Sequence, residues 1–190
     1  PPAVRSLAVS AEGTLYADIH VGWIVRSRDG GDAWESLRNG LNKDVHMVGV
    51  HPTQPPIVFA ATAAGFHFSA DHGDSFDRRV QGMPHHYQRS CAVFPDQDTY
   101  LVSTALHDGG EAAQLYRSED EGENWIRVVG LPDVLNRNID THQIAVLDGG
   151  RAFVVVNDQD LYGSEDGGAT WVRVAENLPR IWSLLAVAGD

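Results

Sequence analysis

Residues Ser118–Trp125 read SEDEGENW, and the same pattern of serine, aspartate, glycine and an aromatic residue occurs three more times in the chain. In every copy the serine is followed by aspartate two positions later, glycine four positions later and an aromatic residue seven positions later. The other copies are SRDGGDAW from Ser27, SADHGDSF from Ser69 and SEDGGATW from Ser164. Successive copies start 42, 49 and 46 residues apart. A four-position pattern at so regular a spacing indicates an internal structural repeat.

Each copy has the residue types of a tight turn. An aspartate carboxylate accepts hydrogen bonds from backbone N–H groups that such a turn leaves unpaired, and serine does the same more weakly. The glycine allows a positive φ angle, and the aromatic residue supplies a large apolar group for packing between sheets. The alternative is a calcium loop, but such loops need ligands at alternating positions closed by a bidentate glutamate, and the copies vary there. We therefore interpret the motifs as structural turns.

The sequence around each motif reads as four short strands bounded by turn residues. In the last repeat we expect strands at 142–147, 152–156, 161–163 and 171–174; in the third repeat we expect them at 90–94, 100–103, 114–117 and 125–129. No window shows a sustained helical period. Four strands in a unit of about 45 residues are typical of a β-propeller blade. The sequence therefore predicts an all-β propeller built of four-stranded antiparallel blades.

The four motifs resemble the Asp-box, or BNR, repeats of sialidase-like β-propellers. Similar repeats occur in xyloglucanase-type glycoside hydrolases, sortilin-type receptors and photosystem II assembly factors. The resemblance covers essentially the whole chain, and it implies a fold without implying an activity. It also implies that each motif is the turn between the third and fourth strands of a blade, on the face away from the ligand site. Function is then expected on the opposite face.

The repeat spacing divides the 190 residues into four blades and a remainder. We expect blades at approximately 3-40, 44-82, 87-131 and 140-178, with 180-188 as the first strand of a further blade. Four-bladed rings are rare, and the resemblance implies six or more blades, so we expect the chain to form part of a larger ring or to exchange its last strand with another chain. The chain does not begin with Met, and we expect that it was processed or truncated. Unsealed blade faces predict self-association.

Polar residues collect before the innermost strand of each predicted blade. Residues two apart on a strand share a face, so Asp44 with His46, and Asp140 with His142, are expected to point the same way. The loops between second and third strands open on the same face and add His20, His107 and Asp108. The candidate ligand-binding residues at this channel mouth are Arg5, Asp44, His46, His86, Tyr87, Arg89, Asp140 and His142.

Composition narrows the possible partners. The formal net charge of −12 opposes binding to nucleic acid or to an anionic membrane surface. No apolar stretch approaches the roughly 18 residues that span a bilayer, and a single cysteine excludes an intrachain disulfide. We expect a soluble protein, with no indication of its compartment. A His/Asp metal site remains an alternative, but its ligands would come from different repeats without a compact motif, so we assign no metal ligand and no cofactor.

Three functions are compatible with these residues. The first is a non-catalytic module that binds a glycan, another polar ligand or a protein at the channel mouth; no catalytic residue is assigned. The second is a glycoside hydrolase of the sialidase or xyloglucanase kind. A sialidase would use arginines such as Arg5, Arg89 and Arg180 with Tyr87, and another glycosidase would use a carboxylate pair such as Asp44 with Asp140 or Asp108 with Asp158. The third is an assembly propeller that lacks a small ligand.

Overall fold

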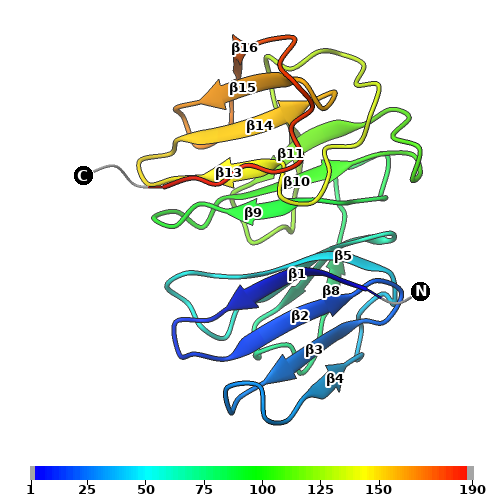
Figure 1. Cartoon of the computed structure of the whole chain (residues 1–190), viewed down its shortest axis with the longest axis vertical. Coiled ribbons are helices and arrows are strands. Elements are labelled where there is room, and N and C mark those ends of the chain that lie inside the picture. Colours follow the sequence, from blue (N-terminus) through cyan, green and yellow to red (C-terminus); the bar gives the residue numbers. More distant parts are fainter. Residues whose placement is uncertain (1–2, 188–190) are drawn as a thin grey trace.

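The computed structural model describes residues 3–187, which form sixteen strands in four antiparallel four-stranded sheets (Figure 1). The first sheet, blade 1, contains β1 (Val4–Val9), β2 (Leu15–Ile19), β3 (Ile24–Ser27) and β4 (Glu35–Leu37). Blade 2 contains β5 (Val45–Val50), β6 (Val58–Thr62), β7 (Gly65–Ser69) and β8 (Asp77–Arg79). Blade 3 contains β9 (Cys91–Val93), β10 (Tyr100–Thr104), β11 (Gln114–Ser118) and β12 (Ile126–Arg127). Blade 4 contains β13 (Ile144–Val146), β14 (Ala152–Val156), β15 (Asp160–Ser164) and β16 (Val172–Ala175).

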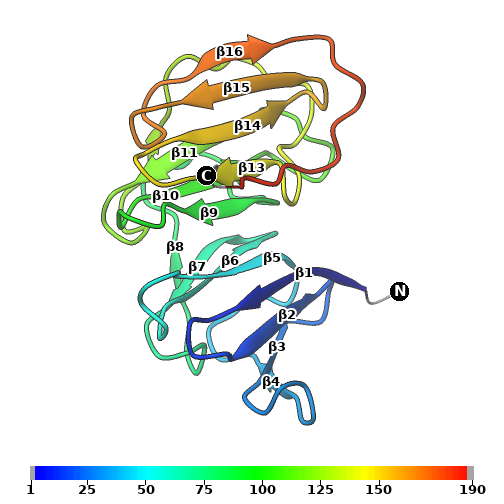
Figure 2. The same ribbon diagram turned by 60° about the vertical axis from the view of Figure 1, so that its left-hand side comes forward.

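The innermost strand of each blade lies beside that of the next, β1 with β5, β5 with β9 and β9 with β13 (Figures 1 and 2). Every blade follows the sequence order of its strands, as in a propeller meander. The predicted all-β propeller architecture is therefore confirmed. Among residues 3–187 there is no helix long and apolar enough to cross a membrane.

The apolar cores lie between successive blades. One core joins Tyr16 and Ile24 of blade 1 to Val58 of blade 2. A second joins blades 2 and 3, and a third joins blades 3 and 4. Alternate residues of β14, which are Ala152, Val154 and Val156, belong to the core shared with blade 3, as expected for sheets packed face to face. No core cluster of the described residues joins blade 1 to blade 4.

The repeat motifs form the turns between third and fourth strands, as expected. In the turn that begins at Ser69, Asp71 Oδ1 accepts hydrogen bonds from Ser69 Oγ at 2.7 Å and from the Ser75 N–H at 2.9 Å. The Gly73 N–H donates to Ser69 Oγ at 2.8 Å. The turns beginning at Ser27, Ser118 and Ser164 have the same bonds. The side chains therefore satisfy the backbone groups of the turn, which is a structural role.

The aromatic residue of each turn packs against the preceding blade. Phe76 belongs to the core between blades 1 and 2, Trp125 to the next core and Trp171 to the third. Trp34 occupies the same position in blade 1, which no blade precedes among residues 3–187, and it is 45% exposed. The motif therefore links its own turn to the neighbouring sheet.

Strand limits differ from the expected ones by one or two residues in blades 3 and 4. The innermost strand of blade 4 begins at Ile144, two residues later than expected, because His142 adopts a left-handed φ of 63°. The last strands begin one residue after Trp125 and Trp171, since these tryptophans belong to the turns.

The described part of the predicted fifth first strand, residues 180–187, has no strand assignment. It runs beside β13 (Figure 2), where the Leu184 N–H donates to the His142 carbonyl at 2.8 Å. Residue 188 lies outside the described residues. The boundaries of the four blades and the role of this segment in a larger ring stay predictions.

Candidate functional site

The candidate site lies at the end of the sheets opposite the repeat turns. Neighbouring strands are antiparallel, so the start of each innermost strand and the turn after β3, β7, β11 or β15 lie at opposite ends of a blade. Bulges distort the start of two innermost strands. In blade 1, Arg5 and Ser6 oppose the single residue Asp18. In blade 2, His46 is the extra residue between Val45, paired with Thr62, and Met47, paired with Ala61. Such bulges turn side chains out of the regular alternation.

A pocket of about 720 Å³ opens at this end. It collects residues from the starts of innermost strands and from the loops between second and third strands, as the sequence predicts for the channel mouth. Its lining consists of Arg5, His20, Asp44, Ala63, Pro84, His85, His86, Tyr87, Arg89, Leu106, His107 and Asp108. Both guanidinium and carboxylate groups therefore face one space with several imidazoles and a phenol.

Asp44 and His46 come together as expected, and His20 joins them. The Asp44 carboxylate Oδ1 lies 3.4 Å from His46 Nε2 and 3.5 Å from His20 Nε2. His46 is fully buried, and His46 Nδ1 lies 2.5 Å from the Gln88 carbonyl. Burial lowers the pKa of His46 below its usual range, although the Gln88 carbonyl and Asp44 act in the opposite direction. The ring of His46 is therefore neutral near pH 7.

Tyr87 and Arg89 lie beside this cluster. The Tyr87 hydroxyl is 3.4 Å from His46 Nε2, and the two rings are 4.9 Å apart between centroids. Burial raises the pKa of Tyr87, and the charge of Arg89 opposes that rise. The Arg89 guanidinium carbon lies 5.6 Å from the Tyr87 ring centroid, within the range of a cation–π contact. Tyr87 therefore presents a neutral hydroxyl group at the pocket.

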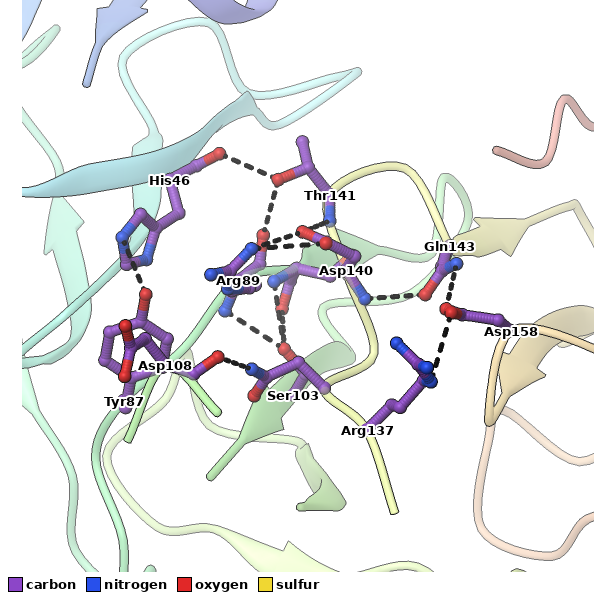
Figure 3. Close-up of polar contacts among 12 residues, drawn as sticks. His46, Tyr87, Arg89, Ser103, Asp108, Arg137, Asp140, Thr141, Gln143 and Asp158 are labelled. Carbon is purple, nitrogen blue, oxygen red and sulfur yellow. Dashed lines mark hydrogen bonds and ion pairs between the residues drawn. The ribbon is translucent and has the colours of Figure 1, made fainter. Parts of the chain in front are cut away.

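Polar contacts at the pocket join three blades (Figure 3). Arg89 Nη1 donates to both carboxylate oxygens of Asp140 at 3.2 Å. Thr141 Oγ1 lies 3.1 Å from the His46 carbonyl and 3.2 Å from the Arg89 carbonyl. The segment before β13 is thus held against the starts of β5 and β9.

His86 lies at the pocket as expected, whereas His142 does not. His86 lines the pocket, but its Nε2 lies 3.1 Å from the Met83 carbonyl and its Nδ1 lies 2.9 Å from Arg78 Nη2, so both ring nitrogens have protein partners. His142 does not line this pocket, and its carbonyl accepts the hydrogen bond from Leu184. Asp140 does not line the pocket either. It is linked to the pocket through its ion pair with Arg89, and the described contacts include none between Asp140 and His142.

The sequence places His20 at this face but does not single it out as a candidate. The signal available in the sequence was its place in the loop between the second and third strands, since that loop is predicted at the same end of the blade as the candidate residues. The approach of His20 to Asp44 depends on the turn after β2. There the Trp23 N–H donates to the Lys43 carbonyl at 3.0 Å, which ties blade 1 to the segment before β5. No local sequence motif predicts this contact between blades.

Four antiparallel four-stranded sheets with a polar pocket at the inner strand ends define the class: a β-propeller fold. No family model and no curated protein sequence matches the chain. Three similar solved structures are an ancestral GH74 enzyme, the extracellular domain of a putative one-component system from B. thetaiotaomicron, and YCF48 bound to D1 peptide.

The ancestral GH74 enzyme has a TM-score of 0.74 and 19% identity, over 90% of this chain and 24% of that chain. The one-component system has a TM-score of 0.68 and 15% identity, over 96% and 24%. YCF48 has a TM-score of 0.53 and 13% identity, over 91% and 82%. The chain thus spans 24% of the length of the first two structures. At these identities the similarity shows the propeller fold and carries no activity over to this chain.

Proposed function

We propose that this chain is a binding module that holds a small polar ligand, such as a glycan, in the pocket at the inner strand ends. One observation carries the proposal: the pocket has about 720 Å³ of space and gathers side chains from three blades. A volume of this size is typical of ligand sites. We also infer that the four repeat turns are Asp-boxes, because all four share one hydrogen-bond pattern around the serine and aspartate.

The groups at the pocket suit hydroxyl and carboxylate groups of a ligand. Arg5 and Arg89 are donors with fixed positive charge, and Asp44 and Asp108 are acceptors. Arg89 Nε is buried and has no hydrogen-bond partner among the described residues. A buried donor without a partner is costly, and a ligand oxygen or a water molecule would satisfy it. Tyr87 adds an aromatic face and a neutral hydroxyl.

Isothermal titration with a panel of neutral oligosaccharides and sugar acids tests the proposal. We expect at least one member to bind, with affinity reduced at least tenfold by Arg5→Ala and by Tyr87→Phe. Arg173→Ala is the control: Arg173 is 52% exposed, pairs with Glu176 and lies on β16, outside the pocket. The assignment of this pocket would be refuted if every ligand that binds did so equally to the unmodified protein and to the three variants. It would also be refuted if no member of the panel bound to the unmodified protein.

A glycoside hydrolase is the alternative, because two carboxylates, Asp44 and Asp108, line the same pocket. The two pairs expected from sequence are not gathered there. Asp140 forms an ion pair with Arg89, and Asp158 pairs with Arg137 at 3.4 Å and Arg180 at 3.2 Å beside another pocket. Hydrolysis of a glycan that Asp44→Asn and Asp108→Asn each abolish would support the enzyme. Sialidase activity that is retained in both Arg89→Ala and Tyr87→Phe would argue against a sialidase mechanism at this pocket.

A further inference from the structure

Three potential metal ligands converge at one corner of the pocket. They are His20 from the turn after β2, Asp44 from the segment before β5, and His46 from β5. One donor atom from each, an imidazole nitrogen or a carboxylate oxygen, lies within 4.8 Å of the other two. Two imidazoles and one carboxylate are the protein ligands of many open zinc sites.

The distances between these donors match a metal site. Two donors bound at the usual Zn–N and Zn–O lengths of a tetrahedral ion lie roughly 3.3 Å apart. Asp44 Oδ1 lies 3.4 Å from His46 Nε2 and 3.5 Å from His20 Nε2. The third side of the triangle, between the two imidazole nitrogens, is at most 4.8 Å. Only His20, which is on a turn and one third exposed, has to move closer.

A partner outside the cluster already orients the buried ligand. His46 Nδ1 lies 2.5 Å from the Gln88 carbonyl, which can only accept a hydrogen bond. Nδ1 therefore carries the proton, and Nε2 presents its lone pair toward Asp44. Metal-bound histidines have this arrangement, with the other ring nitrogen donating to a carbonyl or carboxylate. Asp44 is held by its backbone, because its N–H donates to Asn42 Oδ1 at 2.9 Å and its carbonyl accepts from the Ala63 N–H at 3.0 Å.

The Asp44 carboxylate oxygen at the centre of the cluster is left without a partner. Asp44 Oδ1 is buried and has no hydrogen bond among the described residues. It lies 3.4 Å from His46 Nε2, whose lone pair is otherwise approached by the Tyr87 hydroxyl, also at 3.4 Å. A buried carboxylate oxygen without a donor is costly. A cation there would satisfy the oxygen and both imidazoles at once.

We propose that His20, Asp44 and His46 bind one divalent transition-metal ion, with zinc as the ion to test. Three protein ligands leave a fourth position open. The Tyr87 hydroxyl, 3.4 Å from His46 Nε2, lies at that corner of the pocket. The metal would give the pocket a fixed positive charge beside Arg5, so an anionic group of a ligand would be favoured there. This last point rests on the proposed ligand-binding function, but the metal site itself does not.

The test uses the whole chain without any organic ligand, so that its failure is separate from failure of the ligand screen. The protein is stripped with a chelator, dialysed against Zn²⁺ and analysed for bound metal, and the affinity is measured by titration. We expect one zinc ion per chain. We expect the affinity to fall at least tenfold in His20→Ala and in Asp44→Asn. Co²⁺ loaded in place of zinc should give visible absorption of a tetrahedral site in the unmodified protein and in neither variant.

His107→Ala is the matched control. His107 also lines the pocket and also lies near carboxylates, 3.3 Å from Glu111 and 3.8 Å from Asp108, but it is not part of the three-ligand cluster. His20 is on a surface turn and Asp44→Asn keeps the side-chain shape, and thermal unfolding of each metal-free variant verifies that it folds. Absence of zinc binding in the unmodified protein would overturn the proposal. So would zinc binding that the His20 and Asp44 variants retain and His107→Ala alone weakens.

Discussion

Arg89, which precedes β9, holds Asp140, which precedes β13, through two hydrogen bonds of 3.2 Å from one guanidinium nitrogen. The two residues are 51 positions apart in sequence and belong to neighbouring blades. Their ion pair (Figure 3) joins the two blades at the end opposite the repeat turns.

This pair should stabilise the fold more than an exposed pair of equal length. Arg89 is 20% exposed and Asp140 44% exposed, so water screens the charges only in part. We expect a double-mutant cycle with Arg89→Ala and Asp140→Ala to give a coupling of about 1 kcal/mol in the free energy of unfolding by urea. The control cycle uses Arg127 and Asp133, which also lie 3.2 Å apart but are 41% and 96% exposed. Equal coupling free energies in the two cycles would show that partial burial does not strengthen the Arg89–Asp140 ion pair.

The glycine of a repeat turn is expected to serve packing between blades as well as the turn. Gly122 has a φ of +86°, and a Cβ atom there would lie 2.8 Å from Phe66 of blade 2. Gly13 has nearly the same φ, +85°, with open space around it. Gly13→Ala should lower the free energy of unfolding by about 1 kcal/mol through the backbone alone. Gly122→Ala should cost about 1–3 kcal/mol more, because Phe66 must shift.

Thermal and urea unfolding of the two alanine variants measures that difference. A Gly122→Ala variant no less stable than Gly13→Ala would show that the turn glycine has no packing role. The comparison is informative because both substitutions place a side chain at nearly the same positive φ.

His67 on β7 should make the fold sensitive to mild acid. Burial lowers the pKa of His67 to about 4, and Arg78 acts in the same direction while the Gly65 carbonyl opposes it. The folded protein binds this proton less readily than the unfolded chain, whose histidine pKa is about 6.5. The neutral form of His67 is the one that the fold accommodates, so the free energy of unfolding is not reduced by this group above about pH 6.5. It decreases as the pH falls from 6.5 toward 4. The loss amounts to at most about 3 kcal/mol.

Urea unfolding of the unmodified protein and of His67→Gln across pH 4 to 7 measures this effect. The variant lacks the titrating group, so we expect the difference in stability between the two proteins to change across this window. The carboxylates of the repeat turns and the other buried histidines are common to both proteins and cancel. A constant difference from pH 7 to pH 4 would show that His67 does not resist protonation in the fold.

We propose that the outer faces of blades 1 and 4 bind a second copy of the chain. Leu7 and Val9 of β1 are 69% and 59% exposed, and Val172 and Val174 of β16 are 69% and 56% exposed. On each strand the two side chains are two residues apart and share one face of the sheet, and exposed apolar groups on one face favour association. Light scattering at micromolar concentration should give a mass above that of one chain, and Leu7→Lys should reduce it. Val134→Lys is the control, because Val134 is equally exposed but lies in a loop. A monomeric mass for the unmodified protein would exclude the proposal.

The architecture could be predicted from sequence because its determinants are local. The bonds that Asp29 or Asp71 makes reach only a few residues along the chain, and strand and turn residues alternate within each repeat. That Asp44 and His46 point the same way was also predicted, since the two residues are close in sequence at the beginning of one strand. The limits of the strands were less certain, because a single positive φ at His142 shifts where a strand begins.

The candidate site depended on features that have no signature in the sequence. Bulges at Arg5–Ser6 and at His46 change which side chains face the pocket, and they arise from how each pair of strands fits its neighbours. The Trp23–Lys43 backbone contact joins blade 1 to the segment that holds Asp44, and Asp140 pairs with Arg89 of the neighbouring blade and not with His142.

The sequence alone therefore determined the repeat, the four-stranded blades and the end of the blades at which polar side chains gather. These features follow from hydrogen bonds and hydrophobic alternation over short stretches of chain. Only the tertiary structure decided which of those side chains meet. The 3.5 Å distance from Asp44 Oδ1 to His20 Nε2 joins residues of two blades, and the packing between the sheets sets it.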